Sequence, residues 1–502
     1  MTGNSTDTQV VVVGAGPVGL LLAGELRLGG VDVVVVERLL EPTGESRASQ
    51  LNARTMEVFD QRGLLARLGE TQSEPAGHFG GIGLDVSDVP SVHAGYWKVP
   101  QFRTEDMLTG WAIELGADIR RGHELTGLTS HADHVDVDVI GDGGPVRLRA
   151  EYVVGCDGEQ STVRQLAGFD FPGTSAVREL IRADVRDIDI PPKRFQRFDK
   201  GLAIAQQRDG ITRVMFHTFG RAAGARTEAP RFAEVVGEWA RITGEDISGG
   251  TPVWVDAFDD TSRQAARYRK DRILLAGDAA HVQMPAGGQA LNLGVQDVAN
   301  LGWKLAAQVN GWAPDGLLDS YHDERHPVGV RILTDVRAQT QLLLGGPEVN
   351  AVRTVFGELL QLDDARAHLA ITLSGVDVRY PVGTGTHALL GARLPHSVLG
   401  MDSGSTSTTE LLHTADGVLL DLTGRTTDAA ELRAMAAAWE PRVRVVRARA
   451  DRGSALSNVD AVLVRPDGHI AWIDGGATEL DAALRRWFGD PAVPTHTAKE
   501  LS

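Results

Sequence analysis

A glycine-rich turn between a valine run and an apolar helix is the feature that most constrains the fold of this chain. Residues 10–13 form a continuous β-branched run, as expected for a buried parallel strand. The sequence GAGPVG follows at residues 14–19, and residues 20–28 then have helical composition up to Gly29-Gly30. A second apolar strand is expected over residues 31–36. The sequence therefore predicts a βαβ unit that opens a doubly wound sheet.

The spacing of the glycines is that of a dinucleotide-binding turn. Gly14 permits a tight turn, Gly16 lets a pyrophosphate approach the backbone, and Gly19 lets the helix pack on the strand. The helix that opens at Pro17 presents free N–H groups and the positive end of its dipole to phosphates. Glu37 stands close to the position where the fingerprint expects a carboxylate for the ribose hydroxyls. The motif alone does not distinguish FAD from NAD.

The composition limits the classes of partner and location. The 502 residues suffice for two or three domains. Lysine and arginine number 50 against 67 acidic residues, so the net charge of −17 opposes a nucleic-acid or anionic-membrane partner. The single cysteine, Cys156, rules out internal disulfides and fits a reducing, cytoplasmic location. We find no signal-type N-terminus and no apolar run of about 18 residues, so no membrane span is expected.

The remaining patterns predict a mixed α/β protein. Residues 201–219 read as two antiparallel strands joined by a turn at Asp209-Gly210. Apolar residues at helical spacing predict a long helical zone over about residues 291–344. Beyond about residue 385, strand-like and alanine-rich segments alternate, which predicts a small separate α/β domain.

Two further motifs lie at predicted strand ends. The first is Gly155-Cys156-Asp157-Gly158, and the second is Gly277-Asp278 with a glycine-rich loop after it. Together with the N-terminal turn, they resemble the single-component flavoprotein aromatic hydroxylases, which have the para-hydroxybenzoate-hydroxylase-like fold. All three motifs occur in the family's order across roughly the first 380 residues. The resemblance implies a Rossmann-like FAD-binding domain with an inserted antiparallel-sheet domain that binds substrate.

The resemblance also implies roles for individual residues. Asp278 would accept a hydrogen bond from a ribityl hydroxyl, and Asp157 would lie near the pyrophosphate and the path of the nicotinamide cofactor. Relatives often have glycine where this chain has Ala290, which adds a methyl group to the loop around the flavin ring. The residues implied to contact FAD are Gly14, Gly16, Pro17, Gly19, Glu37, Arg38, Arg47, Gln101, Asp157, Asp278, Pro285, Gly287, Gly288, Gln289, Ala290, Leu291 and Asn292.

A closer resemblance covers nearly the whole chain. The segments RTMEVFDQRG, FDFPGT, LDSYHDERHPVG and VRPDGHIAW are similar to hydroxylases of actinobacterial aromatic polyketide pathways, especially the angucycline group. The rifamycin-inactivating monooxygenases are related. These relatives carry a thioredoxin-like C-terminal domain, which here lacks redox cysteines. The expected domains are a discontinuous FAD-binding domain (1–70, 103–175 and 270–384), a substrate-binding domain (71–102 and 176–269) and the thioredoxin-like domain (385–502).

The implied reaction is hydroxylation of a polycyclic aromatic polyketide. FAD would be reduced by NADPH or NADH and react with O₂ to a C4a-hydroperoxyflavin that hydroxylates the ring, without a metal. A monomer or homodimer is expected. The antiparallel sheet would supply an apolar wall for the flat substrate. The candidates for this wall are Phe79, Trp97, Phe216, Phe219 and Trp254, residue types that more often pack in a protein core than contact a ligand. His217 is a candidate to hydrogen-bond a phenol of the substrate.

Several alternatives stay open. A Baeyer–Villiger oxygenase or a rifamycin-type antibiotic-inactivating monooxygenase could use the same scaffold. A redox-silent FAD-binding partner in a pathway is an alternative of another class. A plain NAD-dependent dehydrogenase would lack the Asp157 and Asp278 motifs, and no halogenase segment of the type tryptophan-x-tryptophan-x-isoleucine-proline is found.

Overall fold

The computed structural model of the chain describes residues 7–43, 50–224, 226, 228–423, 430, 434–474 and 477–491. Its largest sheet has eight strands, and five of them run parallel at its centre. The strand order along the main path is β18-β19-β10-β1-β2-β7, and β8 and β9 extend β10 as a meander. These strands are β1 (Thr8–Val13), β2 (Val33–Glu37), β7 (Asp118–Arg121), β8 (Glu124–Ser130), β9 (Val135–Gly141), β10 (Gly144–Gly155), β18 (Arg269–Lys270) and β19 (Ile273–Leu275).

The valine run predicts this sheet correctly, because a strand covered on both faces needs apolar side chains in both directions. Val10, Val11 and Val12 are fully buried. Helix α1 (Pro17–Leu28) follows β1 and packs against α7 (Gln289–Val309). The predicted βαβ unit is therefore present.

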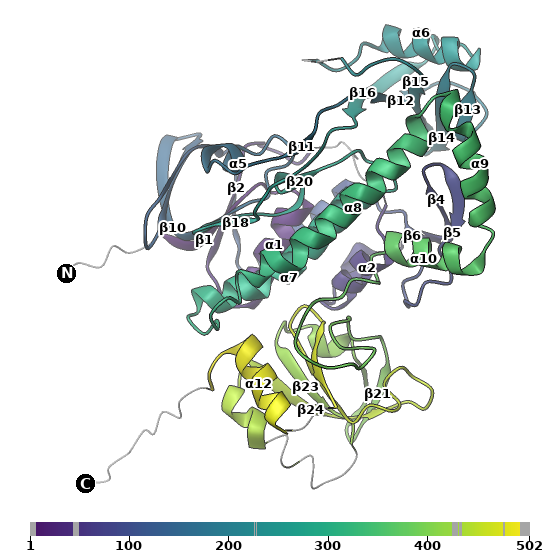
Figure 1. Ribbon diagram of the computed structural model, residues 1–502. Helices are drawn as coiled ribbons and strands as arrows, with labels where there is room; N and C mark the ends of the chain where they lie inside the picture. The colour runs from purple at the N-terminus through teal and green to yellow at the C-terminus, as the bar shows by residue number, and fades with distance from the viewer. Residues whose placement is uncertain are drawn as a thin grey trace, which may run out of the picture.

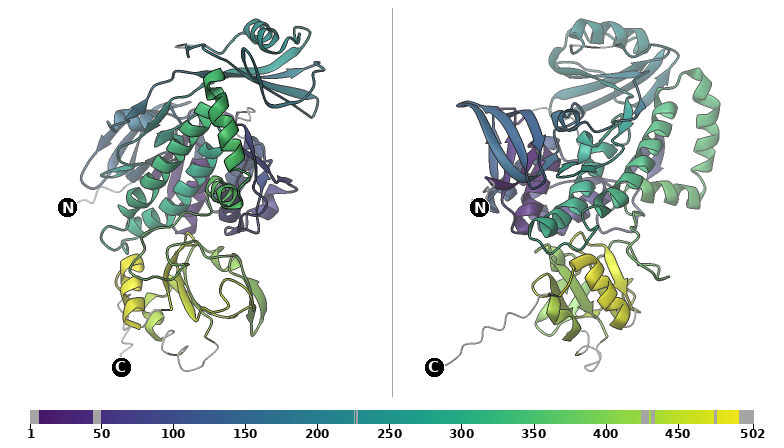
Figure 2. Two further views of the ribbon diagram at one scale, coloured as in Figure 1. Left: turned by 45° about the vertical axis from the view of Figure 1, so that its right-hand side comes forward. Right: turned by 60° about the vertical axis from the view of Figure 1, so that its left-hand side comes forward.

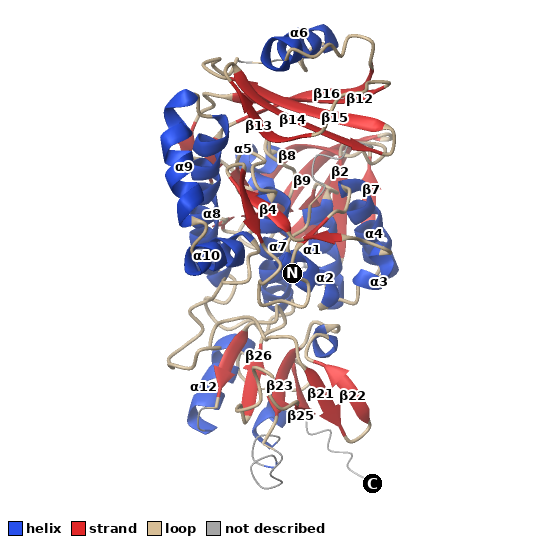
Figure 3. Ribbon diagram, turned by 90° about the vertical axis from the view of Figure 1, so that its right-hand side faces the viewer, coloured by secondary structure: helices blue, strands red, loops and turns tan. Residues whose placement is uncertain are grey.

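A second, antiparallel sheet lies above the first domain, with α6 (Phe232–Thr243) covering its outer face (Figures 1 and 3). Its order is β13-β14-β15-β12-β16. The hairpin predicted around Asp209-Gly210 is present, and both residues have the positive φ angles of a two-residue turn, 52° and 75°. The strands are β12 (Glu179–Arg186), β13 (Lys193–Phe198), β14 (Gly201–Arg208), β15 (Ile211–Thr218) and β16 (Thr251–Asp259).

The predicted helical zone over residues 291–344 is two helices rather than one. Helix α7 ends at Val309, and α8 (Ser320–Leu344) returns along it to the antiparallel sheet (Figure 1). The break contains Gly311, Pro314 and Gly316, and both glycines have positive φ. Apolar periodicity continues on both sides of this break, so periodicity alone did not separate the helices.

The C-terminal region forms a separate small body below the first domain (Figure 2). Its four-stranded sheet has the order β24-β23-β26-β27, with one parallel pair and two antiparallel pairs. This arrangement, closed by a final helix, is thioredoxin-like, as predicted. The elements are β23 (Gly417–Asp421), β24 (Val443–Arg447), β26 (Ala461–Val464), β27 (Ile470–Ile473) and α12 (Ala477–Phe488).

Shorter elements connect these bodies. No described helix is both long enough and apolar enough to cross a membrane. The connecting helices are α2 (Ala53–Asp60), α3 (Leu65–Leu68), α4 (Gln101–Glu114), α5 (Thr162–Leu166), α9 (Asn350–Leu359) and α10 (Asp363–Leu373). The connecting strands are β3 (Ser73–Glu74), β4 (Ala76–Phe79), β5 (Ile82–Asp85), β6 (Tyr96–Trp97), β11 (Gly173–Thr174), β17 (Ser262–Gln264), β20 (His281–Val282), β21 (Val398–Met401), β22 (Gly404–Ser407) and β25 (Arg449–Ala450).

Candidate active site

The three glycine motifs meet at one edge of the parallel sheet. Val13 at the end of β1 is in register with Gly155 at the end of β10, and Gly155 is in register with Leu275 at the end of β19. The carboxyl ends of parallel strands form the crevice where α/β sheets bind ligands. The loops after these three strands therefore enclose a single site, which we call the strand-end crevice.

The first turn has the space and the backbone shape that a pyrophosphate requires. Gly14 has a φ of +103°, and a Cβ there would lie 2.5 Å from the carbonyl oxygen of Cys156. A Cβ at Gly19 would lie 2.0 Å from the carbonyl oxygen of Gly14, so helix and strand pack at backbone distance. At Gly16, in contrast, no described atom lies within 4 Å of such a Cβ. The open space lies at the N-terminus of α1, where N–H groups and the helix dipole favour an anion.

Glu37 is positioned beside this turn by backbone contacts. Its Oε2 accepts a hydrogen bond from the Ala15 N–H at 2.8 Å, and its Oε1 accepts one from the Leu39 N–H at 2.9 Å. The carboxylate is half-buried at the end of β2, and Arg38 follows on the surface. The site thus offers a fixed carboxylate next to the anion-binding turn, as ribose recognition requires.

Asp157 carries an acceptor atom that the protein does not use. Its Oδ2 accepts a hydrogen bond from the Val163 N–H at 3.0 Å, whereas Oδ1 is buried and has no hydrogen-bond partner among the described residues. Burial raises the pKa of this carboxyl above its ordinary value. A buried acceptor without a donor destabilises the protein unless a ligand or water supplies one, so the geometry fits a polar ligand next to the first turn.

The loop after β19 forms the other wall of the crevice. Gly287 and Gly288 have φ angles of 68° and 66°, a conformation that favours glycine, and Gly288 is the N-cap of α7. No side chain caps this helix, so its first N–H groups face the crevice as a second anion-stabilising terminus. Asp278 is exposed at the start of this wall, and Pro285 is exposed within it.

The amide side chains of this loop hold the protein together rather than point to a ligand. Gln289 Nε2 donates to the Leu373 carbonyl at 3.0 Å. Asn292 Nδ2 donates to the Gly288 carbonyl at 2.6 Å, and its Oδ1 accepts from the Asn52 N–H at 3.0 Å. These bonds fix the shape of the loop. Flavin contacts expected of these two residues would therefore fall to their backbone atoms, beside the half-buried Ala290 and Leu291.

Two other residues, Gln101 and Arg47, were also predicted to contact FAD. Gln101 opens α4, and its Nε2 donates to Glu105 Oε1 at 2.8 Å. Arg47 lies outside the described residues.

A cluster of buried charged side chains, which was not predicted from the sequence, supports the crevice at Gly277. Asp297 on α7 accepts hydrogen bonds from the Gly277 N–H at 3.2 Å, His281 Nε2 at 2.7 Å and Arg325 Nε at 2.8 Å. The side chains of Asp297, His281 and Arg325 are fully buried. Burial opposes the charged carboxylate, but Arg325 and His281 outweigh it and lower the pKa of Asp297. The sequence feature that could have indicated this cluster is an acidic residue, Asp297, between Val295 and Val298 of an apolar helix.

A polar cleft of about 390 Å³ opens beside the Pro285 loop. Arg164 lies over the Phe171 ring at 3.9 Å on one side. Gln283 lies on another side, and neither atom of its buried amide group has a hydrogen-bond partner among the described residues. Arg263 and Phe258 complete the rim. The cleft combines two arginines, two aromatic rings and the Gln283 amide with two acidic residues, Glu159 and Asp259, next to the strand-end crevice.

Comparison with known proteins identifies the fold and the cofactor. Residues 7–336 match the family described as "FAD binding domain", and residues 387–491 match the family described as "Aromatic-ring hydroxylase, C-terminal". The chain belongs to the FAD-dependent aromatic-ring hydroxylases. Homologues in this family are named flavin-dependent monooxygenases and hydroxylases, so this hydroxylase is an oxidoreductase, as its motifs predicted.

Several relatives match the hydroxylase over nearly its full length. It is 42% identical to the 12-dehydrotetracycline 5-monooxygenase/anhydrotetracycline 6-monooxygenase of Streptomyces rimosus, over 97% of this chain and 99% of the relative. It is 43% identical to the rifampicin monooxygenase of Streptomyces venezuelae, over 96% and 98%. It is 39% identical to the dialkyldecalin synthase of Streptomyces rugosporus, over 96% and 99%.

Several solved structures resemble the hydroxylase in both sequence and fold. The crystal structure of CabE, an aromatic hydroxylase from angucycline biosynthesis, superposes with a TM-score of 0.93 at 51% identity. The match covers 97% of this chain and 100% of CabE.

The sheet above the crevice presents only part of the expected substrate wall. Residues alternate between the two faces of a strand. Met215 and Phe219 therefore pack towards Met284 and Ala286 of the crevice loop, together with Leu180. Phe216, contrary to the prediction, lies on the opposite face and packs against Trp239 of α6.

The other wall candidates also lie in distinct environments. Phe79 stacks on Phe356 in a separate core cluster, and Trp97 Nε1 donates to the His93 carbonyl. His217 and Trp254 lie on the sheet face opposite α6. His217 Nδ1 is buried 2.7 Å from the Glu179 carbonyl oxygen, whereas Trp254 is half-buried beneath the guanidinium of Arg182 at 4.4 Å.

Proposed function

We propose that this hydroxylase transfers one oxygen atom from O₂ to an angucycline-type polycyclic aromatic polyketide, with FAD as cofactor and NADPH or NADH as the source of electrons. The observation that supports it most is the convergence of three strand-end loops beneath an antiparallel sheet. The 51% identity to an angucycline hydroxylase supports the substrate class.

Different residues of the crevice would bind different parts of the cofactor. When bound, FAD would supply electron transfer from the nicotinamide and activation of O₂. The open space at Gly16 and the N-terminus of α1 would bind its pyrophosphate, and Glu37 its adenosine ribose. Asp157 Oδ1 would accept a hydrogen bond near the pyrophosphate, and the N-terminus of α7 would stabilise negative charge on the reduced ring.

The polar cleft beside Pro285 supports a docking place for the nicotinamide cofactor. Arg164 and Arg263 contribute positive charge that attracts phosphate oxygens, and their guanidinium groups also donate to the Ala279, Glu159 and Phe171 carbonyls and to Ser175 Oγ. The unpaired amide of Gln283 can donate to and accept from a carboxamide, which matches the end group of nicotinamide. The cleft adjoins the loop proposed to wrap the flavin ring, so a docked nucleotide would reach it over a short distance.

The sheet above the crevice would exclude water and position the substrate. Leu180, Met215 and Phe219 contact the crevice loop through apolar surface, which suits a flat polycycle more than a small polar substrate. The thioredoxin-like domain contains no cysteine, so we assign it no thiol chemistry. We propose for this hydroxylase the same domain boundaries that were predicted from its sequence.

Consumption of NADPH by the purified protein tests this function. We expect bound FAD, and we expect an angucyclinone to accelerate NADPH oxidation with formation of a hydroxylated product. NADPH oxidation that no polycyclic aromatic accelerates would contradict the proposal. Product structure, rather than mass, separates hydroxylation from Baeyer–Villiger insertion, because each adds one oxygen.

A second candidate is inactivation of a rifamycin-type antibiotic, favoured by the 43% identity to a rifampicin monooxygenase. The same assay with rifampicin in place of the angucyclinone compares the two substrates directly. A third outcome follows from the 39% identity to a dialkyldecalin synthase, whose name denotes no oxygen transfer. Substrate conversion without NADPH consumption would favour such a redox-silent role.

A further inference from the structure

The hairpin between β8 and β9 carries three side chains of the types that bind divalent transition metals. The His131 N–H donates to the His134 carbonyl at 2.8 Å, so these two histidines flank a two-residue loop. Directly opposed residues of an antiparallel pair project to the same face, and Asp136, two residues after His134, projects there too. The register of the hairpin thus collects two imidazoles and a carboxylate on one face.

The distances between these groups are those of a coordination shell. His131 Nε2 lies 3.3 Å from Asp136 Oδ2, and His134 Nε2 lies 3.5 Å from Asp136 Oδ1. One ligand atom from each residue lies within 4.8 Å of the other two. Tetrahedral zinc with bonds of about 2.0–2.1 Å places neighbouring ligand atoms about 3.4 Å apart. The two imidazole rings stack with their centroids 4.4 Å apart, so binding an ion would require the rings to turn towards it.

A fourth residue orients one of the imidazoles. His134 Nδ1 lies 2.7 Å from Asp133 Oδ1. Metal-binding histidines usually donate their other ring N–H to a carboxylate, which fixes the tautomer and increases ligand basicity. With the proton on Nδ1, Nε2 directs a lone pair towards the Asp136 carboxylate. Two electron-rich groups at this distance favour a cation between them.

Two neighbouring arginines contact Asp136, and Arg149 Nε donates a long hydrogen bond to its Oδ1. Arg149 and Arg147 approach its oxygens at 3.4 and 3.9 Å, longer than the roughly 2.7–2.9 Å of a strong charge-assisted hydrogen bond. Both arginines reach solvent, with exposed side-chain fractions of 30% and 60%, and can move away.

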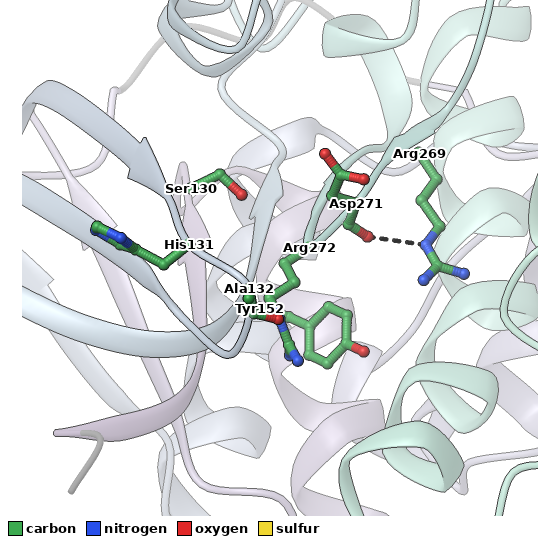
Figure 4. Close-up of a pocket in the computed structure, with 7 residues that line it drawn as sticks. All are labelled: Ser130, His131, Ala132, Tyr152, Arg269, Asp271 and Arg272. Atoms are coloured by element: carbon green, nitrogen blue, oxygen red, sulfur yellow. Dashed lines mark hydrogen bonds between the residues drawn. The ribbon is translucent and has the colours of Figure 1, made fainter. Parts of the chain in front are cut away.

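The other face of the hairpin is anchored. Arg272 Nε donates to the Ala132 carbonyl at 2.9 Å, and the Arg272 guanidinium lies 5.1 Å from the centre of the Tyr152 ring. A surface hollow of about 490 Å³ lies on that side. His131 is one of the residues that line this hollow, and in Figure 4 its ring points away from Arg272 and Tyr152. The anchored loop holds the three ligands in place without an ion.

We propose that His131, His134 and Asp136 bind one divalent transition-metal ion of the zinc class, with water in the remaining position. Imidazole with a single carboxylate is a ligand set that suits zinc better than calcium or magnesium, which prefer oxygen ligands. The ion would fasten β8 to β9 in the FAD-binding sheet, level with the start of β1 rather than at the strand-end crevice. This site is independent of the proposed oxygenase reaction.

Metal content of the full-length protein tests the site. The chain is prepared without a polyhistidine tag, stripped with a chelator, incubated with Zn²⁺ or Co²⁺ and separated from free metal by gel filtration. We expect about one equivalent of bound metal per chain by atomic emission, and a visible Co²⁺ spectrum of low-symmetry coordination. We also expect saturating Zn²⁺ to raise the melting temperature, because the ion binds only the folded hairpin.

Matched variants make the result specific. His131→Ala and Asp136→Asn should each lower affinity at least about 100-fold, and Asp133→Asn about 10–100-fold, as for other residues that orient a ligand. His123→Ala, in the connection before β8 and outside the cluster, should bind like the wild type. Unchanged FAD content would show that the variants fold. Absence of bound metal in the wild type, or equal binding by the His131→Ala and His123→Ala proteins, would overturn the proposal.

Discussion

The Gly16→Ala substitution separates cofactor binding from folding more cleanly than any other change in the crevice. Gly16 has a φ of −76° and a ψ of 177°, which an L-residue adopts without strain. No described atom lies within 4 Å of the added methyl group. Replacing glycine at a compatible position stabilises a protein by about 0.4–1 kcal/mol, because it restricts the unfolded chain. The FAD-free variant should therefore be at least as stable as the wild type.

The same methyl group would occupy the space proposed for the pyrophosphate. Displacing the phosphates would lose at least two charge-assisted hydrogen bonds to backbone N–H groups, each worth about 1.5–3 kcal/mol. A loss of about 3 kcal/mol raises the dissociation constant of FAD more than 100-fold. Quenching of flavin fluorescence on titration of the apoprotein measures this constant, and urea unfolding of the apoprotein measures stability.

Gly19→Ala provides the contrasting control. Its Cβ would lie 2.0 Å from the Gly14 carbonyl oxygen and 3.3 Å from Cys156 Cβ, so α1 must move away from β1. Overpacking of this kind costs about 1–3 kcal/mol or more, and this variant should lose stability without FAD. If the Gly16→Ala protein binds FAD like the wild type, or its apoprotein is as unstable as that of Gly19→Ala, the reasoning is refuted.

Three further predictions rest on single buried groups. Burial raises the pKa of Asp157 in the folded state, so the folded protein favours the neutral carboxyl, and this contribution is lost as pH rises through the raised pKa. Asp157→Asn should therefore stabilise the apoprotein at pH 8 more than at pH 4 in urea unfolding, and a pH-independent difference would contradict this. Arg465 is fully buried against the Glu324 and Asp467 carboxylates, and Lys304 also contacts Glu324. Arg465→Met leaves Asp467 without its arginine and Glu324 with Lys304 alone, so it should destabilise the protein by about 3–5 kcal/mol, whereas exposed Arg208→Met should change stability by less than about 0.5 kcal/mol. Gln283→Leu should raise the KM for NADPH severalfold with unchanged FAD content, and exposed Gln207→Leu on β14 should not; equal KM values would remove the amide from nicotinamide binding.

The elements that the sequence predicts well are those set by short-range patterns. The turn at residues 14–19 is recognisable because each glycine has a local reason, a positive φ or an approach to backbone. The Asp209-Gly210 hairpin is predicted for the same reason. The order of the three strand-end motifs then indicated the family, and hence that they would meet.

Features that depend on tertiary packing were not predictable in this way. Asp297 meets Gly277 and Arg325 only because α7 packs beneath the loop after β19 and α8 returns beside it. Alternation along β15 shows that Phe216 and Met215 face opposite ways, but not which face α6 covers. The resemblance implied that Gln289 and Asn292 contact FAD, but it could not indicate that their side-chain amides bond to Leu373 and Asn52, which are distant in the chain.

The most direct test of the account is transfer of oxygen from ¹⁸O₂ to an angucyclinone by the purified protein with FAD and NADPH, followed by mass spectrometry. The account predicts a product that contains one oxygen-18 atom and forms only when NADPH is present. A converted product without oxygen-18, or conversion that does not require NADPH, would contradict the assignment of this chain as a monooxygenase.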